Sequence, residues 1–193
     1  MNLPNKLTVG RILLVPFFVA ALLIDFPLNN AVALLLFVAA SLTDMFDGKI
    51  ARKNNLVTDF GKFADPLADK ILVLAAFLCF VQLGICDCIA VIIVLFREFS
   101  VTSIRLIAAA KGKVVAANMW GKTKTVSQMI AIIAVIAMQI VLDLPDIGAA
   151  VNAAALEPAF IIAGEILIWI SVVFTIISGI VYIVQNRQFI SQT

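Results

Sequence analysis

The sequence predicts an all-α membrane protein with six transmembrane helices and with both termini on the cytoplasmic side. Of its 193 residues, 63% are hydrophobic and only 13% are charged, whereas a soluble domain is nearer half apolar and a quarter charged. The apolar residues form long blocks that do not alternate with a period of two. Because lipid forces a backbone to satisfy its own hydrogen bonds, and a helix needs about 20 mostly apolar residues to cross a bilayer, these blocks indicate helices.

The apolar blocks predict six spans in a single membrane domain over residues 1–193. We expect them at 10–25, 31–53, 62–84, 88–109, 125–143 and 160–184. Pro66 is tolerated in the first turn of a helix, so the third helix should begin just before it. The first block could be a signal peptide, but five spans and no clear small-residue cleavage site follow, so we expect it to be retained.

The charged residues predict how the spans are oriented. The 14 lysine and arginine residues lie near the termini, around the connection between spans two and three, or around that between spans four and five. The other three connections carry only acids: Asp25, Asp87, Asp143, Asp146 and Glu157. Because cationic loops stay cytoplasmic, the termini should lie inside, with a positive surface facing anionic headgroups or substrates.

The histidine and cysteine content of the chain argues against several kinds of metal site and catalysis. The chain has no histidine, and its three cysteines lack the spacing of a zinc site. This argues against zinc, haem and histidine-based general base catalysis. A disulfide between Cys86 and Cys88 is conceivable at the predicted outer loop, but we expect free thiols at a helix end.

Four aspartates lie in the charged segment that joins the second and third spans. Five residues follow one helical stripe at i, i+3, i+4, i+7 and i+8: Asp44, Asp47, Gly48, Ala51 and Arg52. Three more follow at i, i+4 and i+8: Gly61, Asp65 and Asp69. Because a short loop makes the two antiparallel helices neighbours, the four carboxylates should converge at the cytoplasmic end of the bundle.

The convergence of four carboxylates predicts a site for divalent cations. Ligands that are all oxygen favour Mg²⁺ or Mn²⁺, and four aspartates on two helices suit a pair of ions that grip both sides of a phosphoryl displacement. Arg52 offers a planar guanidinium that suits phosphate oxygens. Gly48, Ala51 and Gly61 lack bulk, so a ligand can approach the backbone. Together these residues predict a diphosphate site.

Three other readings of the aspartates remain open. A solvated cytoplasmic loop, with acids that balance nearby lysines and arginines, explains one pair better than four acids in helical register. A divalent-cation transporter also uses carboxylates within the membrane, but Arg52 would repel a permeating cation. A purely structural membrane subunit has no need of four acids.

The aspartate segment resembles the signature of the CDP-alcohol phosphatidyltransferase family. The pattern D-x2-D-G-x2-A-R-x8-G-x3-D-x3-D is matched at all eight fixed positions. The resemblance implies a six-helix membrane fold, a homodimer, and attack by a hydroxyl on the phosphatidyl phosphorus of a CDP-linked lipid, with CMP leaving. It also implies that the four aspartates hold the metal ions and that Asp69 takes the hydroxyl proton. The resemblance places the nucleotide against Gly48, Ala51, Arg52 and Gly61.

Polar residues in the first span resemble the family's N-terminal contribution to the nucleotide site. These residues are Asn5, Thr8 and Arg11, at i, i+3 and i+6. The alternative is an N-capped first helix whose arginine extends along apolar surface to keep its charged head in water.

Charges in the fourth span bear on the acceptor alcohol. Arg97 and Glu98 lie well inside this span, where an arginine costs at least ~2.5–3.5 kcal/mol unless it faces a cavity or a partner. The two could form a buried structural pair, yet an excess of positive charge facing the aspartates suits an acceptor that carries a phosphate. Four residues are candidates for that phosphate: Arg97, Arg105, Lys122 and Lys124.

Further runs sharpen the resemblance toward bacterial members that use sn-glycerol 3-phosphate. The runs are NLPNKLTVGR, REFSVTSIR and VVAANMWGKTKT, with Ser103 as a departure where glycine is expected. They imply CDP-diacylglycerol as donor, phosphatidylglycerol phosphate as product, and a bacterial plasma membrane with the active site at its cytoplasmic face. No nucleic-acid partner is implied. The rivals within the family are synthesis of cardiolipin, phosphatidylserine or an inositol phosphate lipid.

Overall fold

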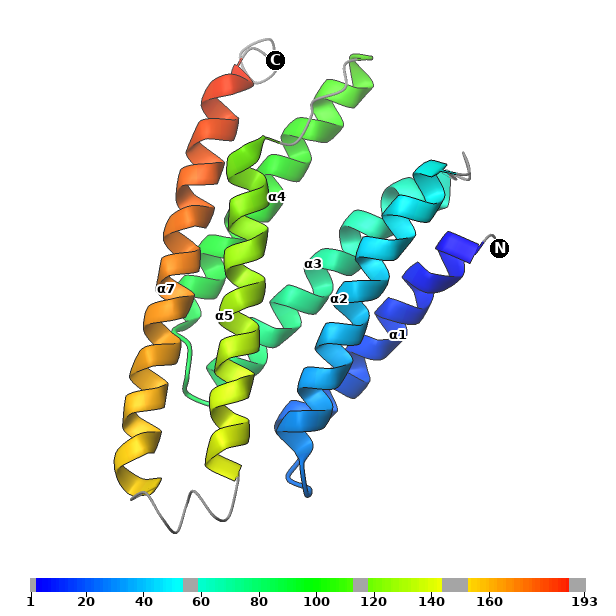
Figure 1. The fold of residues 1–193 in the computed structure, drawn as a ribbon. Helices are drawn as coiled ribbons and strands as arrows, with labels where there is room; N and C mark the ends of the chain where they lie inside the picture. The colour runs from blue at the N-terminus through cyan, green and yellow to red at the C-terminus, as the bar shows by residue number, and fades with distance from the viewer. Residues whose placement is uncertain (1–2, 54–58, 113–117, 144–152, 188–193) are drawn as a thin grey trace.

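All regular secondary structure in the described part of the chain is helical. A computed structural model describes residues 3–53, 59–112, 118–143 and 153–187, although the side chains of 3–7, 44–53, 59–66, Asp69 and 153–155 fall outside the described part. Within these ranges there are six helices: α1 (Leu3–Leu23), α2 (Asn29–Lys53), α3 (Asp59–Gln82), α4 (Cys88–Ala110), α5 (Met119–Asp143) and α7 (Ala153–Gln185) (Figure 1). Each predicted span falls on one of them, which confirms the all-α class.

Two of the described helices, α5 and the part of α7 over Leu156–Gln185, are long and apolar enough to cross a membrane. The second and third helices combine an apolar segment with the charged segment that joins them. Helix α3 begins at Asp59 and contains Pro66. The prediction that this helix begins just before Pro66 was therefore wrong. Proline has no backbone N–H, so a helix that contains it lacks one backbone hydrogen bond. Helix α3 nevertheless continues on both sides of Pro66.

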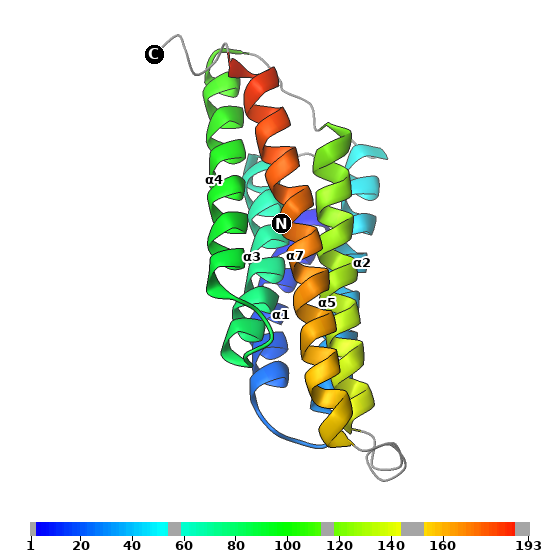
Figure 2. The same ribbon diagram turned by 90° about the vertical axis from the view of Figure 1, so that its left-hand side faces the viewer.

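The helices form an up-and-down bundle, and the start of α1 and the end of α7 lie in the same half of it (Figure 1). Helix α1 packs against α2 and α3, and α7 packs against α4 and α5 (Figure 2). Contacts of α3 with α4 and α5, and of α2 with α5, join the two groups. We call the half of the bundle that holds the termini the terminal half and the other the far half. The end of α2 and the start of α3 both lie in the terminal half (Figure 1).

Buried side chains differ between the two halves. The far half is filled by apolar side chains, the largest being Phe18, Phe37, Phe77, Phe80, Ile132, Ile136 and Ile168. The terminal half buries most of the polar or charged ones, among them Thr8, Arg11, Glu98, Lys124, Gln128 and Ser178. It also holds a small buried cluster of Val101, Ile104 and Tyr182. Helices α1 and α5 each pass from polar to apolar buried residues partway along their length, whereas α4 buries Glu98 with apolar residues on both sides of it.

The outer surface of the bundle is apolar. Phe17, Phe96 and Phe99 are 66%, 73% and 68% exposed. Such side chains are normal where a helix faces lipid and unusual in this number where it faces water. The surface therefore agrees with a membrane location.

The turn between α3 and α4 lies in the far half of the bundle (Figure 1). Asp87 caps α4, because its Oδ1 accepts a hydrogen bond from the backbone N–H of Ile89 at 2.9 Å. The three cysteines are free thiols, as predicted, with Cys86 buried and Cys88 exposed. Burial, reinforced by the nearby Asp87 carboxylate, raises the pKa of the Cys86 thiol to about 12. Cys86 is therefore protonated at neutral pH.

Candidate active site

The aspartate positions fall on two neighbouring helices. Asp44 and Asp47 lie on α2, and Asp65 and Asp69 lie on α3. The two helices pack against each other, and their aspartate-bearing ends lie in the terminal half (Figure 1). The side chains of these four residues lie outside the described part, as do those of Asn5, Gly48, Ala51, Arg52 and Gly61. The convergence of the carboxylates therefore stays a prediction.

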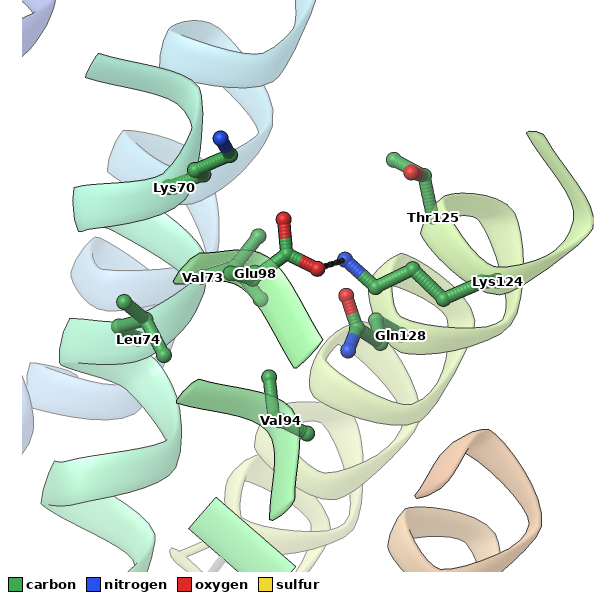
Figure 3. A pocket seen from close by; sticks show the side chains of 8 residues that line it. All are labelled: Lys70, Val73, Leu74, Val94, Glu98, Lys124, Thr125 and Gln128. Atoms are coloured by element: carbon green, nitrogen blue, oxygen red, sulfur yellow. Dashed lines mark hydrogen bonds and ion pairs between the residues drawn. The ribbon is translucent and has the colours of Figure 1, made fainter. Parts of the chain in front are cut away.

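The stripe of α3 that carries Asp65 and Asp69 continues into the described part. Val73 follows Asp69 at i+4, so the two positions lie on one face of the helix, one turn apart. Val73 lines a small pocket between α3, α4 and α5 (Figure 3). We call this the floor pocket, and its lining includes Lys70, Val73, Glu98, Lys124, Thr125 and Gln128. It lies about one helical turn deeper in the bundle than Asp69.

An ion-pair network closes one side of the floor pocket. Glu98 Oε1 accepts hydrogen bonds from Lys124 Nζ at 2.6 Å and from Arg97 Nη1 at 3.0 Å. The side chains of Glu98, Lys124 and Arg97 are only 9%, 8% and 11% exposed. Burying charges costs several kcal/mol per ion, so breaking such a pair is destabilising while forming it brings little net stability. The network links α4 to α5 at the depth of the pocket.

A second polar contact links α3 to α4 beside the pocket. Lys70 Nζ donates to Thr102 Oγ1 at 2.6 Å, and that hydroxyl donates in turn to the Glu98 carbonyl at 2.7 Å. Glu98 and Thr102 are four residues apart and share the face of α4 that meets α3 and α5. Lys70 directly follows Asp69 in the chain, so this contact anchors the end of the aspartate stripe.

The two arginines of α4 make their contacts with α7. Arg97 Nη2 donates to Ser178 Oγ at 2.6 Å, and a Cβ at Gly179 would lie 3.0 Å from Arg97 Cγ. Arg105 Nε donates to Tyr182 Oη at 3.3 Å, and its guanidinium carbon lies 5.5 Å from the centre of that ring. The absence of a side chain at Gly179 therefore lets Arg97 lie against α7.

The four candidate phosphate residues divide into two groups. Lys124 and Arg97 are joined through Glu98 and are largely buried. Arg105 and Lys122 are exposed, and no contact among the described side chains joins them to that network. Their binding of an acceptor phosphate stays a prediction.

Two polar residues of α1, Thr8 and Arg11, are buried. Thr8 is 0% and Arg11 is 2% exposed, and α1 packs on the two helices that carry the aspartates. An arginine that extends to keep its head in water would be more exposed than this. Burial of Arg11 therefore argues against the alternative of a first helix with a solvated arginine.

Sequence reasoning missed Lys70, Thr102 and Gln128. A signal existed for Gln128, because it follows Lys124 at i+4 and is a polar residue in an apolar run, where an amide needs a hydrogen-bond partner. Thr102 gave no such signal, since a threonine satisfies itself on the carbonyl four residues earlier. Among the described side chains there is no group of three or more metal-binding residues.

The fold and site define a helical bundle with a charged interior in one half, below two aspartate-bearing helix ends. The sequence model for CDP-alcohol phosphatidyltransferases matches residues 1–177. The chain therefore belongs to the CDP-alcohol phosphatidyltransferase family.

Three relatives carry one name, CDP-diacylglycerol–glycerol-3-phosphate 3-phosphatidyltransferase. The Bacillus subtilis protein is 41% identical, covering 96% of this chain and 95% of its own. The Rickettsia bellii protein is 40% identical, covering 94% and 93%. The Haemophilus influenzae protein is 38% identical, covering 68% and 73%. The similarity to the first two runs through nearly the whole chain, including the helices that line the floor pocket.

Proposed function

We propose that this protein transfers the phosphatidyl group of CDP-diacylglycerol to sn-glycerol 3-phosphate, giving phosphatidylglycerol phosphate and CMP. The observation that carries the proposal is similarity over nearly the whole chain to relatives named for this reaction. The chain also matches all eight fixed positions of the family signature.

The proposal places the bundle across a bacterial plasma membrane as six spans, with the terminal half toward the cytoplasm. Two features support it. The outer surface carries many exposed apolar side chains, and the lysines and arginines cluster near the termini and the two connections at the terminal end. A substrate phosphate then reaches the site from the cytoplasm, and the lipid reaches it from the bilayer.

The donor chemistry of the aspartates fits two divalent ions. The four positions offer only carboxylate oxygens, and the chain has no histidine that would favour zinc. Asp44, Asp47, Asp65 and Asp69 would hold Mg²⁺ or Mn²⁺. When bound, such ions offset the charge that builds on the diphosphate as CMP leaves.

The residues of the site then divide the remaining work. Asp69 takes the proton of the attacking hydroxyl, because an alcohol is a poor nucleophile at neutral pH without a base in hydrogen-bond reach. Residues of α1, α2 and α3 hold the CDP group: Asn5, Thr8, Arg11, Gly48, Ala51, Arg52 and Gly61. Cationic residues of α4 and α5 attract the acceptor phosphate: Arg97, Arg105, Lys122 and Lys124. A homodimer, as the resemblance implies, is checked by light scattering of the purified protein in detergent.

The test is CMP release from CDP-diacylglycerol by purified protein with Mg²⁺ and a panel of acceptors. We expect release with sn-glycerol 3-phosphate and not with serine, inositol phosphate or phosphatidylglycerol. Release with one of the other acceptors alone would replace the proposed substrate. Metal flux into liposomes that is indifferent to CDP-lipid, without CMP release, would replace the enzyme with a transporter.

A further inference from the structure

The floor pocket has room for one small group. Its cavity volume is about 10 Å³, which is close to the least space that a water molecule needs. A phosphate group is several times larger. The pocket therefore suits a single oxygen-sized group at the end of a ligand that lies mainly nearer to Asp69.

Gln128 directs a hydrogen-bond acceptor at this pocket. The side chain is fully buried, and its Nε2 donates to Thr175 Oγ1 at 3.2 Å. The Thr175 hydroxyl uses its one hydrogen to donate to the Ser171 carbonyl at 2.8 Å. Thr175 can therefore only accept from Gln128, and this fixes which way the amide faces.

This orientation leaves Gln128 Oε1 without a hydrogen-bond donor. Within the described part of the chain, Gln128 Oε1 is buried and accepts no hydrogen bond. Figure 3 shows the oxygen on the side of Lys124 and the pocket, and the nitrogen turned away. Buried acceptors without a donor are rare in folded proteins, so this oxygen calls for a donor that the ligand or solvent supplies.

The unpaired Gln128 oxygen favours a hydroxyl group over a phosphate. The Glu98 carboxylate faces the pocket from α4 and already pairs with Lys124 and Arg97. Lys70 and Lys124 line the pocket as well, so its charge alone does not exclude a phosphate. A phosphate dianion, however, has no hydrogen to donate to the Gln128 oxygen. A hydroxyl group instead donates one hydrogen bond to an acceptor and fits the available volume.

The depth of the pocket sets which hydroxyl reaches it. Asp69 and Val73 are one helical turn apart on α3, or about 6 Å along the axis. In a three-carbon alcohol with a terminal hydroxyl at Asp69, the neighbouring secondary hydroxyl can point one turn deeper. The phosphate on the third carbon then stays outside the floor pocket.

We propose that Gln128 Oε1 accepts a hydrogen bond from the secondary hydroxyl of the acceptor alcohol, which makes Gln128 a specificity-determining residue. The inference rests on the proposed function and adds the group that recognises the acceptor. It predicts discrimination against an acceptor of the same length and charge that lacks this hydroxyl. A site built to bond a hydroxyl rejects such analogues strongly, because its buried polar group is left unpaired.

The test compares sn-glycerol 3-phosphate with 3-hydroxypropyl phosphate in CMP release by the full-length protein. We expect the wild type to prefer glycerol 3-phosphate by about 100-fold or more in kcat/KM. Gln128→Met has a similar shape but no acceptor, so it should lower kcat/KM for glycerol 3-phosphate by about 10- to 100-fold. It should leave kcat/KM for the analogue nearly unchanged. The control is Gln139→Met, which makes the same change further along α5 and should alter neither value.

The outcomes separate the inference from the proposed function. No CMP release with either acceptor would defeat the proposed function itself. Equal use of both acceptors by the wild type would overturn the inference even if Gln128→Met did not fold, and would assign the pocket to water. An equal loss for both acceptors in Gln128→Met would show that Gln128 only supports the fold.

Discussion

The two halves of the bundle differ in the share of polar and charged side chains that they bury. In the far half, Phe18, Phe37 and Phe77 fill the space between α1, α2 and α3. In the terminal half, Glu98 and Lys124 occupy the interior with hydrogen-bonded charges. Apolar burial stabilises a fold directly, whereas a buried ion pair returns little beyond its own desolvation cost. The far half therefore holds the bundle together, and the terminal half keeps its polar interior for chemistry.

Asp69→Asn should show the largest effect, and it should be confined to activity. Removal of a general base lowers turnover by about 10²- to 10⁴-fold, and loss of a metal ligand adds to this. CMP release measures the rate, and size-exclusion chromatography checks that the protein remains folded. Asp25→Asn, at the far end, is the matched control and should keep its activity. Near-normal CMP release by Asp69→Asn would remove Asp69 as the base.

Phe18→Ala tests the far half through stability. Phe18 is 0% exposed while its neighbour Phe17 is 66% exposed, so only the first substitution opens a cavity. We expect Phe18→Ala to lower the free energy of unfolding by about 3–5 kcal/mol, measured by denaturant titration in mixed micelles. Phe17→Ala should change it little. CMP release per folded molecule should be unchanged in both variants. A loss of this activity in Phe18→Ala alone would show that the far half also contributes to catalysis.

Glu98→Gln tests the ion-pair network in the terminal half. The amide can still accept one hydrogen bond, but Lys124 and Arg97 lose their buried counter-charge. We expect a loss of about 1–3 kcal/mol in the free energy of unfolding. The double variant Glu98→Gln, Lys124→Met removes a buried cation as well, so it should recover part of this loss. Additive losses would mean that the 2.6 Å contact between the two residues is energetically unimportant.

Thiol labelling should show the smallest difference between variants, and it tests which end of the bundle faces the outside of the cell. Burial and the Asp87 carboxylate raise the pKa of Cys86 to about 12, so its neutral thiol should react slowly at neutral pH. The exposed Cys88 should react at least about tenfold faster. In intact cells, a membrane-impermeant maleimide should label a variant whose single cysteine is Cys88. Labelling of Cys88 only after the membrane is opened would reverse the proposed orientation.

The fold class was predictable because a long apolar segment can cross lipid only as a helix or as part of a closed barrel, which satisfy the backbone hydrogen bonds. The start of α3 was not, since a proline gives a local signal for a helix beginning and the helix runs through Pro66. Arg97 and Arg105 are eight residues apart on α4, a spacing that puts them on one face of a helix, and both contact α7. Which neighbour a face meets is a tertiary property, so spacing alone could not identify Ser178 or Tyr182 as partners.

The candidate site was predictable only where residues repeat with a helical period. The aspartates do so, and they matched a family signature. Gln128 is a single polar residue whose role depends on Thr175, which lies 47 positions away. No local pattern encodes that pairing or the unmet oxygen that results from it.

Binding of Mn²⁺ by the purified protein, followed by electron paramagnetic resonance, tests the central claim about the terminal half most directly. We predict two ions per chain whose spins interact because they share the four aspartates, and loss of that signal in Asp44→Asn and in Asp69→Asn. Protein with all four aspartates intact that binds no Mn²⁺, or binds it equally well in both variants, would contradict the account.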